Sequence, residues 1–378
     1  MGADLPNGGL QIRSTVTPAG RLEIELAHAP ILQPGPDQLV VRIEAAPINP
    51  SDIIPLLAGC NPADGTYAGT AEEPRVSFDL PPAAMAGLAG RIGQAMPVGL
   101  EGAGTVVAAG EQARELIGRR VAFLSMSSGS FGRYATVSLS ECAPLPEGVS
   151  ARQGAGLFCN PLTVMAMVET LAQIGETAMI HTAAASNLGQ MLVRVCKEDG
   201  VPLVNVVRRE EHVALLHSLG AEHVCNSAAP SFREDLARAV AATGATVAFD
   251  AIGGGTMASE LLAAMEAGSA SRMPAYSAYG SSQMKRVYIY GLLNPGATEL
   301  PRRGYGMAWS VEGWAMPPIL ARAGPERAMA LTRRVIDNIT TTFASDYGHE
   351  ISLAGALQRD AMLGYCRKAT GEKYLVVP

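Results

Sequence analysis

The 378-residue sequence has few of the residue patterns from which metal and thiol sites are built. No two of its six cysteines form a CxxC pair, so the usual zinc-knuckle and dithiol redox spacings are both missing. The six histidines include no HExxH pair, and His212 and His217 would point about 140° apart on a helix. A GxSxG nucleophile elbow is missing as well. These gaps argue against metal catalysis and serine-triad chemistry, and we expect no bound metal.

Charged residues are also scarce, at 17% of the chain, and 29 basic against 35 acidic residues leave a net charge of −6. A chain of this sign is not drawn to phosphate backbones or anionic lipid. No stretch free of Asp, Glu, Lys and Arg reaches the ~20 residues of a membrane-spanning helix. The first residues lack the basic start and apolar core of a secretory signal. We therefore expect a cytoplasmic protein that binds neither nucleic acid nor membrane.

The N-terminal part of the chain reads as short strands separated by Gly and Pro. Residues 39–45 alternate between apolar side chains on one face and Arg42 and Glu44 on the other, which predicts a half-buried strand. Residues 59–97 form an irregular stretch rich in Ala, Gly and Pro, which indicates a functional lid or an inserted segment. Further strands are predicted at 104–107, 120–123 and 134–137.

Beyond residue 155, helical periods alternate with short β-branched runs, a pattern that predicts a parallel sheet covered on both faces. The clearest helix is 188–198, whose apolar side chains form a single stripe. A second apparent insertion occupies residues 269–284. The predicted strands are 177–182, 203–207, 246–250 and 287–291, and the predicted helices are 188–198, 210–219 and 256–266.

The strand at 177–182 runs into a turn of small residues, Ala183-Ala184-Ala185-Ser186-Asn187-Leu188-Gly189. Such a turn lets a pyrophosphate approach the backbone closely, and the helix N-terminus presents free N–H groups and partial positive charge. Only Gly189 remains of the three glycines usual in this motif. Taken alone, the turn therefore fits a tight packing turn equally well.

The next predicted strand, 203–207, ends in Arg208-Arg209, and Arg208 stands nineteen residues beyond Gly189. A protein that binds NAD tends to carry an acidic residue near this spacing, whereas a guanidinium can hold the 2′-phosphate of NADP. The pair therefore predicts NADPH as the cofactor. The alternative is a solvated basic pair at a strand end.

Six segments follow one another along the chain: AAPINPSD at 45–52, PVGLEGAGTV at 97–106, GSFGRYA at 129–135, NPLT at 160–163, NVVR at 205–208 and LGAEHV at 219–224. In this order they resemble the medium-chain dehydrogenase/reductase superfamily, in its zinc-independent branch of NADPH:quinone oxidoreductases and enoyl reductases. The resemblance implies an α/β protein with a GroES-like β-rich catalytic domain at 1–155 and a Rossmann doubly wound parallel-sheet NADPH-binding domain at 156–317. Residues 318–378 would return to the catalytic domain.

The resemblance also implies a chemistry without zinc, because zinc members carry Cys where Asn49 stands and His where Leu100 stands. A metal-free hydride transfer leaves a negative oxygen that needs hydrogen-bond donors. The expected catalytic donors are Asn49, Tyr134 and Thr163, with Tyr67 added if the 59–96 loop folds back. Asn49 could instead cap its turn, Tyr134 could be a core aromatic, and Tyr67 could be a surface tyrosine.

The cofactor contacts that the resemblance implies lie mostly in the second domain. Lys373, in a C-terminal G-K-like segment, could equally be a solvated lysine. The full expected set is Asn160, Ser186, Asn187, Leu188, Gly189, Arg208, Arg209, Asn226, Ser227, Gly253, Gly291, Asn294 and Lys373.

Three functions remain open from the sequence. The first is an NADPH-dependent reductase of a small electrophilic acceptor, a quinone or an α,β-unsaturated carbonyl. The second is an enoyl-thioester reductase that acts on acyl chains carried by coenzyme A or a carrier protein. The third is an NADPH-binding sensor without turnover. We also expect a homodimer, because residues 306–314 read as an apolar edge strand that a twofold partner could join.

Overall fold

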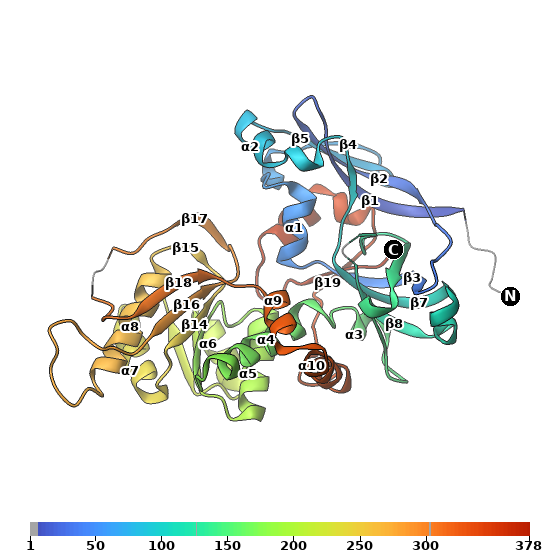
Figure 1. The fold of residues 1–378 in the computed structure, drawn as a ribbon. Coiled ribbons are helices and arrows are strands. Elements are labelled where there is room, and N and C mark those ends of the chain that lie inside the picture. The colour runs from blue at the N-terminus through green and yellow to red at the C-terminus, as the bar shows by residue number, and fades with distance from the viewer. Residues whose placement is uncertain (1–6, 126, 302–303) are drawn as a thin grey trace. The chain divides into compact units, whose positions relative to one another are not determined.

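The computed structural model describes residues 7–125, 127–301 and 304–378, and this part of the chain forms two compact units. The first unit combines the described residues up to Asn160 with Arg334–Pro378, and the second is Pro161–Arg333. Figure 1 shows the first as rich in strands and the second as a sheet with helices around it. The predicted fold class, a β-rich domain plus a parallel-sheet domain, is confirmed.

The first unit is built on two sheets, counted over the described residues. One is a five-stranded antiparallel sheet in the order β4-β5-β2-β1-β6. The other runs β10-β8-β7-β3-β20-β19, with β9 paired to β3. Their strands are β1 (Gly8–Val16), β2 (Arg21–Pro30), β3 (Gln38–Pro47), β4 (Thr66–Gly69), β5 (Pro74–Asp79), β6 (Ala95–Pro97), β7 (Glu101–Ala109), β8 (Arg120–Leu124), β9 (Tyr134–Ser138), β10 (Cys142–Pro144), β19 (His349–Ile351) and β20 (Tyr374–Val376).

The chain end joins the first unit through β20, which pairs antiparallel with β3 at Leu375 and Pro47. Buried side chains from both ends of the chain, such as Ile43 and Val376, share one apolar core. The return of the C-terminal segment therefore rests on a strand pairing and on core packing. The helices of this unit are α1 (Pro50–Leu57), α2 (Pro82–Gly87), α3 (Ala151–Gly154) and α11 (Arg359–Cys366).

The segment 59–97 is more ordered than its composition indicates, which corrects the expectation of an irregular stretch. It contains β4 and β5, and β5 pairs antiparallel with β2. Val76 and Phe78 alternate with polar residues in β5 and are almost fully buried. Two apolar positions between Ala-, Gly- and Pro-rich flanks are too few to predict a strand from sequence.

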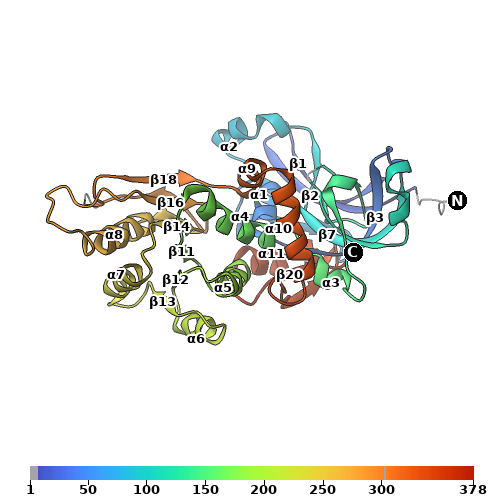
Figure 2. The same ribbon diagram turned by 60° about the horizontal axis from the view of Figure 1, so that its bottom comes forward.

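The second unit contains a parallel sheet of six strands within the described residues, in the order β13-β12-β11-β14-β16-β18. Figure 2 shows α7 and α8 on one face of this sheet and α4 and α5 on the other. Its strands are β11 (Met179–Thr182), β12 (Leu203–Val207), β13 (His223–Asn226), β14 (Val247–Asp250), β16 (Lys285–Ile289) and β18 (Trp309–Gly313), with β15 (Gly253–Gly255) and β17 (Asn294–Thr298) paired separately. Its helices are α4 (Cys159–Ile174), α5 (Asn187–Asp199), α6 (Glu210–Ser218), α7 (Phe232–Thr243), α8 (Met257–Ala270), α9 (Met316–Ala323) and α10 (Pro325–Asp337), of which α4 and α10 run across the unit boundaries.

The second unit ends at Arg333, later than the expected residue 317, because α9 and the start of α10 bind to α4. Gln173 Nε2 donates to the carbonyl of Ile319 at 3.3 Å, and Arg327 pairs with Glu169 at 2.9 Å. Among the described residues, Ala151–Ile174 is the one helical stretch long and apolar enough to cross a membrane. Since 72% of its most apolar part is buried inside the protein, it also fits the description of a core helix.

The loop at 271–284 is attached to the second unit by a buried ion pair. Lys285 is fully buried, and its Nζ lies 2.8 Å from Glu266 Oε2 and 2.9 Å from Ser281 Oγ. Glu266 also accepts the backbone N–H of Ser281 at 2.8 Å. Burial raises the pKa of Glu266, but the bonds from Lys285 and Ser281 outweigh it and hold this pKa below its usual value.

Replacing Lys285 with Met should lower the free energy of unfolding of the second unit by about 3 kcal/mol, because it leaves a buried carboxylate without its cation. Both tryptophans, Trp309 and Trp314, lie in this unit, so their fluorescence during urea unfolding measures it directly. The double variant Lys285→Met/Glu266→Gln should recover part of the loss. The exposed Lys197→Met is the control. Equal stability of Lys285→Met and the control would contradict the role assigned to the pair.

Candidate functional site

Asn49 forms hydrogen bonds through both its backbone and its side-chain amide. It is the N-cap of α1, directly after β3, and Pro50 at the first helical position favours the helix start. Its backbone N–H donates to Asp52 Oδ2 at 2.7 Å, one half of a capping box. Its amide Nδ2 donates to Glu101 Oε1 at 2.8 Å, and its Oδ1 accepts from Lys373 Nζ at 3.1 Å. Asn49 therefore does more than cap a turn.

Glu101, at the start of β7, is the centre of this network and was given no role from sequence. Its carboxylate is fully buried. Besides Asn49, it accepts the backbone N–H groups of Phe158 at 2.9 Å and Cys159 at 2.8 Å, at the N-terminus of α4. A carboxylate at this helix end is stabilised by the unpaired N–H groups and the helix dipole. The motif GLEGAG contained Glu101, but its partners lie far away in sequence.

Lys373 reaches the network from the residue before β20. It is partly buried, and its Nζ lies 5.7 Å from the centre of the Tyr347 ring, within cation–π range. Burial lowers the pKa of Lys373, although Glu101, Cys159 and Asp52 act in the opposite direction. The structure thus places Lys373 beside Asn49, and its expected contact with a cofactor stays a prediction.

Asp52 is fully buried and accepts two backbone N–H groups, from Asn49 and from Leu100 at 2.9 Å. Burial raises the pKa of Asp52 to about 7, and the neighbouring Glu101 carboxylate adds to the rise. The two backbone bonds and Lys373 oppose this shift. Asp52 therefore has a structural role at the start of α1, with a proton affinity that the sequence did not reveal.

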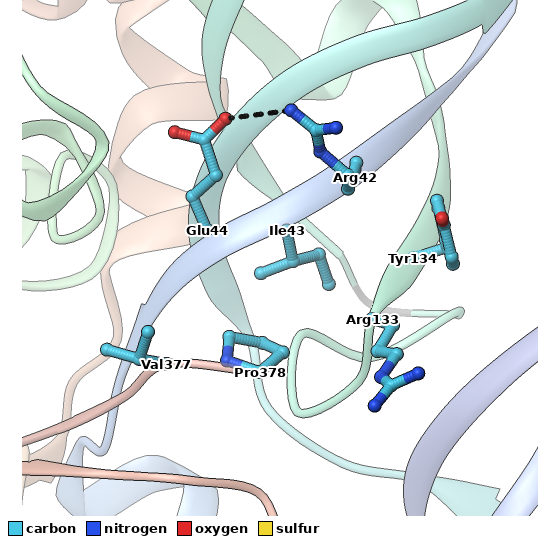
Figure 3. A pocket seen from close by; sticks show the side chains of 7 residues that line it. All are labelled: Arg42, Ile43, Glu44, Arg133, Tyr134, Val377 and Pro378. Atoms are coloured by element: carbon cyan, nitrogen blue, oxygen red, sulfur yellow. Dashed lines mark ion pairs between the residues drawn. The ribbon is translucent and has the colours of Figure 1, made fainter.

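The two predicted tyrosines lie outside this network. Tyr67 is in β4, and its hydroxyl donates to the carbonyl of Pro62 at 2.7 Å. Burial raises the pKa of Tyr67, which makes it a poorer acid. Tyr134, in β9, lines a pocket of about 450 Å³ in the first unit. Figure 3 shows Tyr134 there opposite Arg42, which forms a 3.8 Å ion pair with Glu44.

Asn160 and Thr163 both lie in the first turns of α4, three residues apart and hence on one side of the helix. The unit boundary falls between them, after Asn160. Their expected roles at the cofactor and the acceptor stay predictions. In the described ranges, no three His, Cys, Asp or Glu side chains are close enough to hold a metal ion.

In the second unit, the small-residue turn lies between β11 and α5, as predicted. Ser186 is the N-cap of α5, and its Oγ accepts the N–H of Gly189 at 3.1 Å. A Cβ on Gly189 would lie 2.1 Å from the carbonyl oxygen of Ala184, so only glycine fits there. Leu188 points into the core, whereas Ser186 and Asn187 are partly exposed at the helix end.

The loop after β14 is shaped by Asp250, which is fully buried. Asp250 accepts from Thr182 Oγ1 at 2.7 Å and from the N–H of Gly253 at 3.2 Å. Gly253 has φ +80° and pairs with Asn294, and a Cβ on it would lie 2.8 Å from the carbonyl oxygen of Gly291. The structure therefore brings together the predicted residues Gly253, Gly291 and Asn294 at the carboxyl end of β14, where ligands bind in open α/β sheets.

The predicted phosphate-binding arginines follow β12 and are exposed. Arg209 pairs with Glu211 at 3.1 Å, and both side chains are more than half exposed. At the end of the neighbouring strand, Asn226 donates to Glu210 at 3.2 Å, and Ser227 N–H donates to the carbonyl of Val207 at 2.7 Å. Arg208, Arg209, Asn226 and Ser227 are thus gathered at one edge of the sheet.

Sequence reasoning missed a buried pair beside the turn. His181 Nε2 lies 2.7 Å from the hydroxyl of Tyr290, and burial lowers the pKa of His181 to about 3. Trp314 packs edge-on against Tyr290, with ring centres 6.2 Å apart. His181 is therefore a neutral core residue. Its place in the predicted strand 177–182 was the only sign of that burial.

Two family models match the chain. The model for the alcohol dehydrogenase GroES-like domain matches residues 35–147, and the model named zinc-binding dehydrogenase matches residues 188–285. Together they cover more than half of the sequence. The chain belongs to the medium-chain dehydrogenase/reductase superfamily.

Solved structures share this fold over nearly the whole chain. One from Mesorhizobium loti, assigned as an NADPH:quinone reductase, is 26% identical, with a TM-score of 0.73 and full coverage of both chains. The Escherichia coli quinone oxidoreductase complexed with NADPH is 18% identical, and a mutant enoyl thioester reductase from Candida tropicalis is 19% identical. Both have a TM-score of 0.65 over 98% of this chain and 100% of theirs, and at these identities they show the fold alone.

Curated relatives include reductases of acyl chains. The mitochondrial enoyl-[acyl-carrier-protein] reductase of Caenorhabditis elegans is 27% identical over 208 residues, 54% of this chain and 52% of the relative. A mycocerosic acid synthase-like polyketide synthase of Mycobacterium tuberculosis is 26% identical over 248 residues, 65% of this chain and 10% of the relative. The chain thus spans about half of one relative's length and a tenth of the other's.

The raised pKa of Asp52 predicts a pH-dependent stability. Asp52 keeps its proton up to about pH 7 when folded but loses it near 3.8 when unfolded, so stability declines as the pH rises between these values. The decline is at most about 4 kcal/mol. The side chain of Asp52→Asn cannot titrate. The free energy of unfolding of this variant relative to the wild type, measured by calorimetry, should therefore increase as the pH rises. The exposed Asp79→Asn is the control. Parallel pH curves for the wild type and Asp52→Asn would contradict the shift.

Proposed function

We propose that this chain is an NADPH-dependent reductase that transfers a hydride, without a metal, to a quinone or an α,β-unsaturated carbonyl. One observation carries the proposal. In the second unit, a turn of small residues precedes α5 and two exposed arginines follow β12, and the strands before them, β11 and β12, are neighbours in the parallel sheet. Bound NADPH would supply the hydride from its nicotinamide ring. The 26% identity to the Mesorhizobium loti protein supports the same function.

The residues present fit a dinucleotide. Gly189 lies so close to Ala184 that the turn is free of side chains there, and Ser186 and Asn187 are partly exposed at the helix N-terminus, where a pyrophosphate would bind. Arg209 is engaged by Glu211, but an exposed pair of this kind contributes only about 0–1 kcal/mol. A hydrogen bond to a charged group contributes about 1.5–3 kcal/mol, so a 2′-phosphate can displace the carboxylate.

Enoyl-thioester reduction is the second candidate, and the curated relatives favour it. The Caenorhabditis elegans relative is named as an enoyl-[acyl-carrier-protein] reductase, and its identity to this chain matches that of the Mesorhizobium loti protein within one per cent. Both candidates need the same cofactor and the same transfer. They differ only in the acceptor.

We also propose that the protein is cytoplasmic and forms a homodimer. The support for the dimer is β18, which lies at the edge of the parallel sheet and is paired on one side with β16. Trp309, at the start of β18, is 42% exposed. An edge strand with exposed apolar side chains is a template for pairing with a second copy.

The double variant Arg208→Ala/Arg209→Ala should weaken NADPH binding by roughly tenfold to hundredfold, because it removes charge-assisted bonds to the 2′-phosphate. NADH binding should change little, since NADH lacks this phosphate. Cofactor fluorescence titration measures both dissociation constants. Arg238→Ala, another exposed arginine of the second unit, is the control. Equal losses for both cofactors would remove the assignment of NADPH.

A panel of quinones, enones and enoyl thioesters separates the candidate functions. We expect NADPH oxidation, followed by absorbance, with quinones and enones. Higher kcat/KM with enoyl thioesters would favour the second candidate. Tight NADPH binding without turnover of any acceptor would contradict both candidates and favour a sensor.

A further inference from the structure

The side-chain amide of Asn49 has a fixed orientation. Its Nδ2 donates to the Glu101 carboxylate at 2.8 Å, and its Oδ1 accepts from the Lys373 ammonium at 3.1 Å. A flipped amide would place its NH₂ group against the ammonium and its oxygen against the carboxylate. Both contacts would then be repulsive, so only one orientation is stable.

This arrangement uses only part of the available donors. Asn49 Nδ2 carries two hydrogens and gives one to Glu101, and Lys373 Nζ carries three and gives one to Asn49. The remaining hydrogens belong to two groups that are bridged by a 3.1 Å bond and are therefore neighbours. Two adjacent donors, one of them cationic, are what a negatively charged oxygen requires.

We propose that Asn49 and Lys373 form an oxyanion site for the acceptor and that Lys373 donates the proton that completes its reduction. The proposal rests on the reductase function proposed above. In this proposal, Asn49 and Lys373 bind the acceptor's conjugated oxygen, which gains negative charge when the acceptor receives a hydride. It also moves the proton donor from the predicted tyrosines to a lysine.

The step balances with NADPH as the reductant. The acceptor gains two electrons with the hydride, which forms a new C–H bond on an enone or a new O–H bond on a quinone, and NADPH is oxidised to NADP⁺. The acceptor's oxygen then carries one negative charge as an enolate or a hydroquinone anion. One N–H bond of Lys373 breaks, an O–H bond forms, and the neutral amine regains a proton from water.

Other acids in the first unit are less suitable. The Tyr67 hydroxyl is already bonded to Pro62, and Asp52 is fully buried with both oxygens occupied by backbone donors. Lys373 is only partly buried as a residue, unlike Asp52. The titratable groups that face it are Glu101, Asp52, Cys159 and the ring of Tyr347. Burial lowers the pKa of Lys373 and so eases its loss of a proton.

The test compares Lys373→Met, Lys373→Arg and the exposed control Lys368→Met. With an enone or a quinone, Lys373→Met should lower kcat about 100-fold or more at saturating NADPH, measured at a temperature where circular dichroism shows the variant to be folded. Lys373→Arg keeps the cation but is a far weaker acid, so it should restore oxyanion binding and little of kcat. Lys368→Met should behave as the wild type.

A second measurement needs no turnover. The probe is 4-nitrophenol, whose colour reports its ionisation, bound in the presence of NADP⁺. The wild type and Lys373→Arg should favour the bound phenolate, and Lys373→Met should lose this preference by roughly tenfold to hundredfold. Turnover with equal kcat in the wild type and Lys373→Met would overturn the proton transfer, and equal phenolate binding would overturn the oxyanion site. Phenolate binding that depends on Lys373, without turnover of any acceptor, would support the site and contradict the reductase function.

Discussion

The buried carboxylate of Glu101 is the constraint on which the first unit's site depends. A charge in the protein interior costs several kcal/mol unless its oxygens are hydrogen-bonded. Glu101 meets this requirement with three donors, the amide of Asn49 and the backbone N–H groups of Phe158 and Cys159. It thereby joins the end of β3, the start of β7 and the first turn of α4. Lys373 adds the C-terminal strand through Asn49, so four distant segments are fixed together.

The elements that the sequence predicts well are those whose burial is continuous along the chain. The prediction for β12 is correct at both ends because all five residues of Leu203–Val207 are buried and bounded by Pro202 and Arg208. The apolar stripe of α5 and its Gly200 terminus identify that helix in the same way. By contrast, β5 buries only alternate residues and depends on β2 for its bonds, so its local sequence carries little information.

The residues of the candidate site also differ in how well the sequence predicts their positions. The turn at Ser186–Gly189, the arginines after β12 and the glycines of the β14 loop all follow strands of one parallel sheet, so strand order alone brings their groups to one edge. No such rule predicts which residues meet in the network of the first unit. Residues 49, 101 and 373 meet through antiparallel pairings of β3 with β7 and with β20, and spacing in sequence does not encode these registers. Asn49 was identified from its motif, but its partners could not be.

The charge balance of the network explains why a lysine belongs there. Burial raises the pKa of Asp52 to about 7, so near neutrality Asp52 is partly protonated while the ammonium of Lys373 faces Glu101. With Asp52 protonated, one cation and one anion remain, and the cluster is close to neutral. A neutral cluster can accept the negative charge of a reduced acceptor without adding to a repulsion already present. Once Lys373 has lost its proton, however, Glu101 lacks a compensating charge, which favours rapid reprotonation of the amine from solvent and returns the site to its starting state.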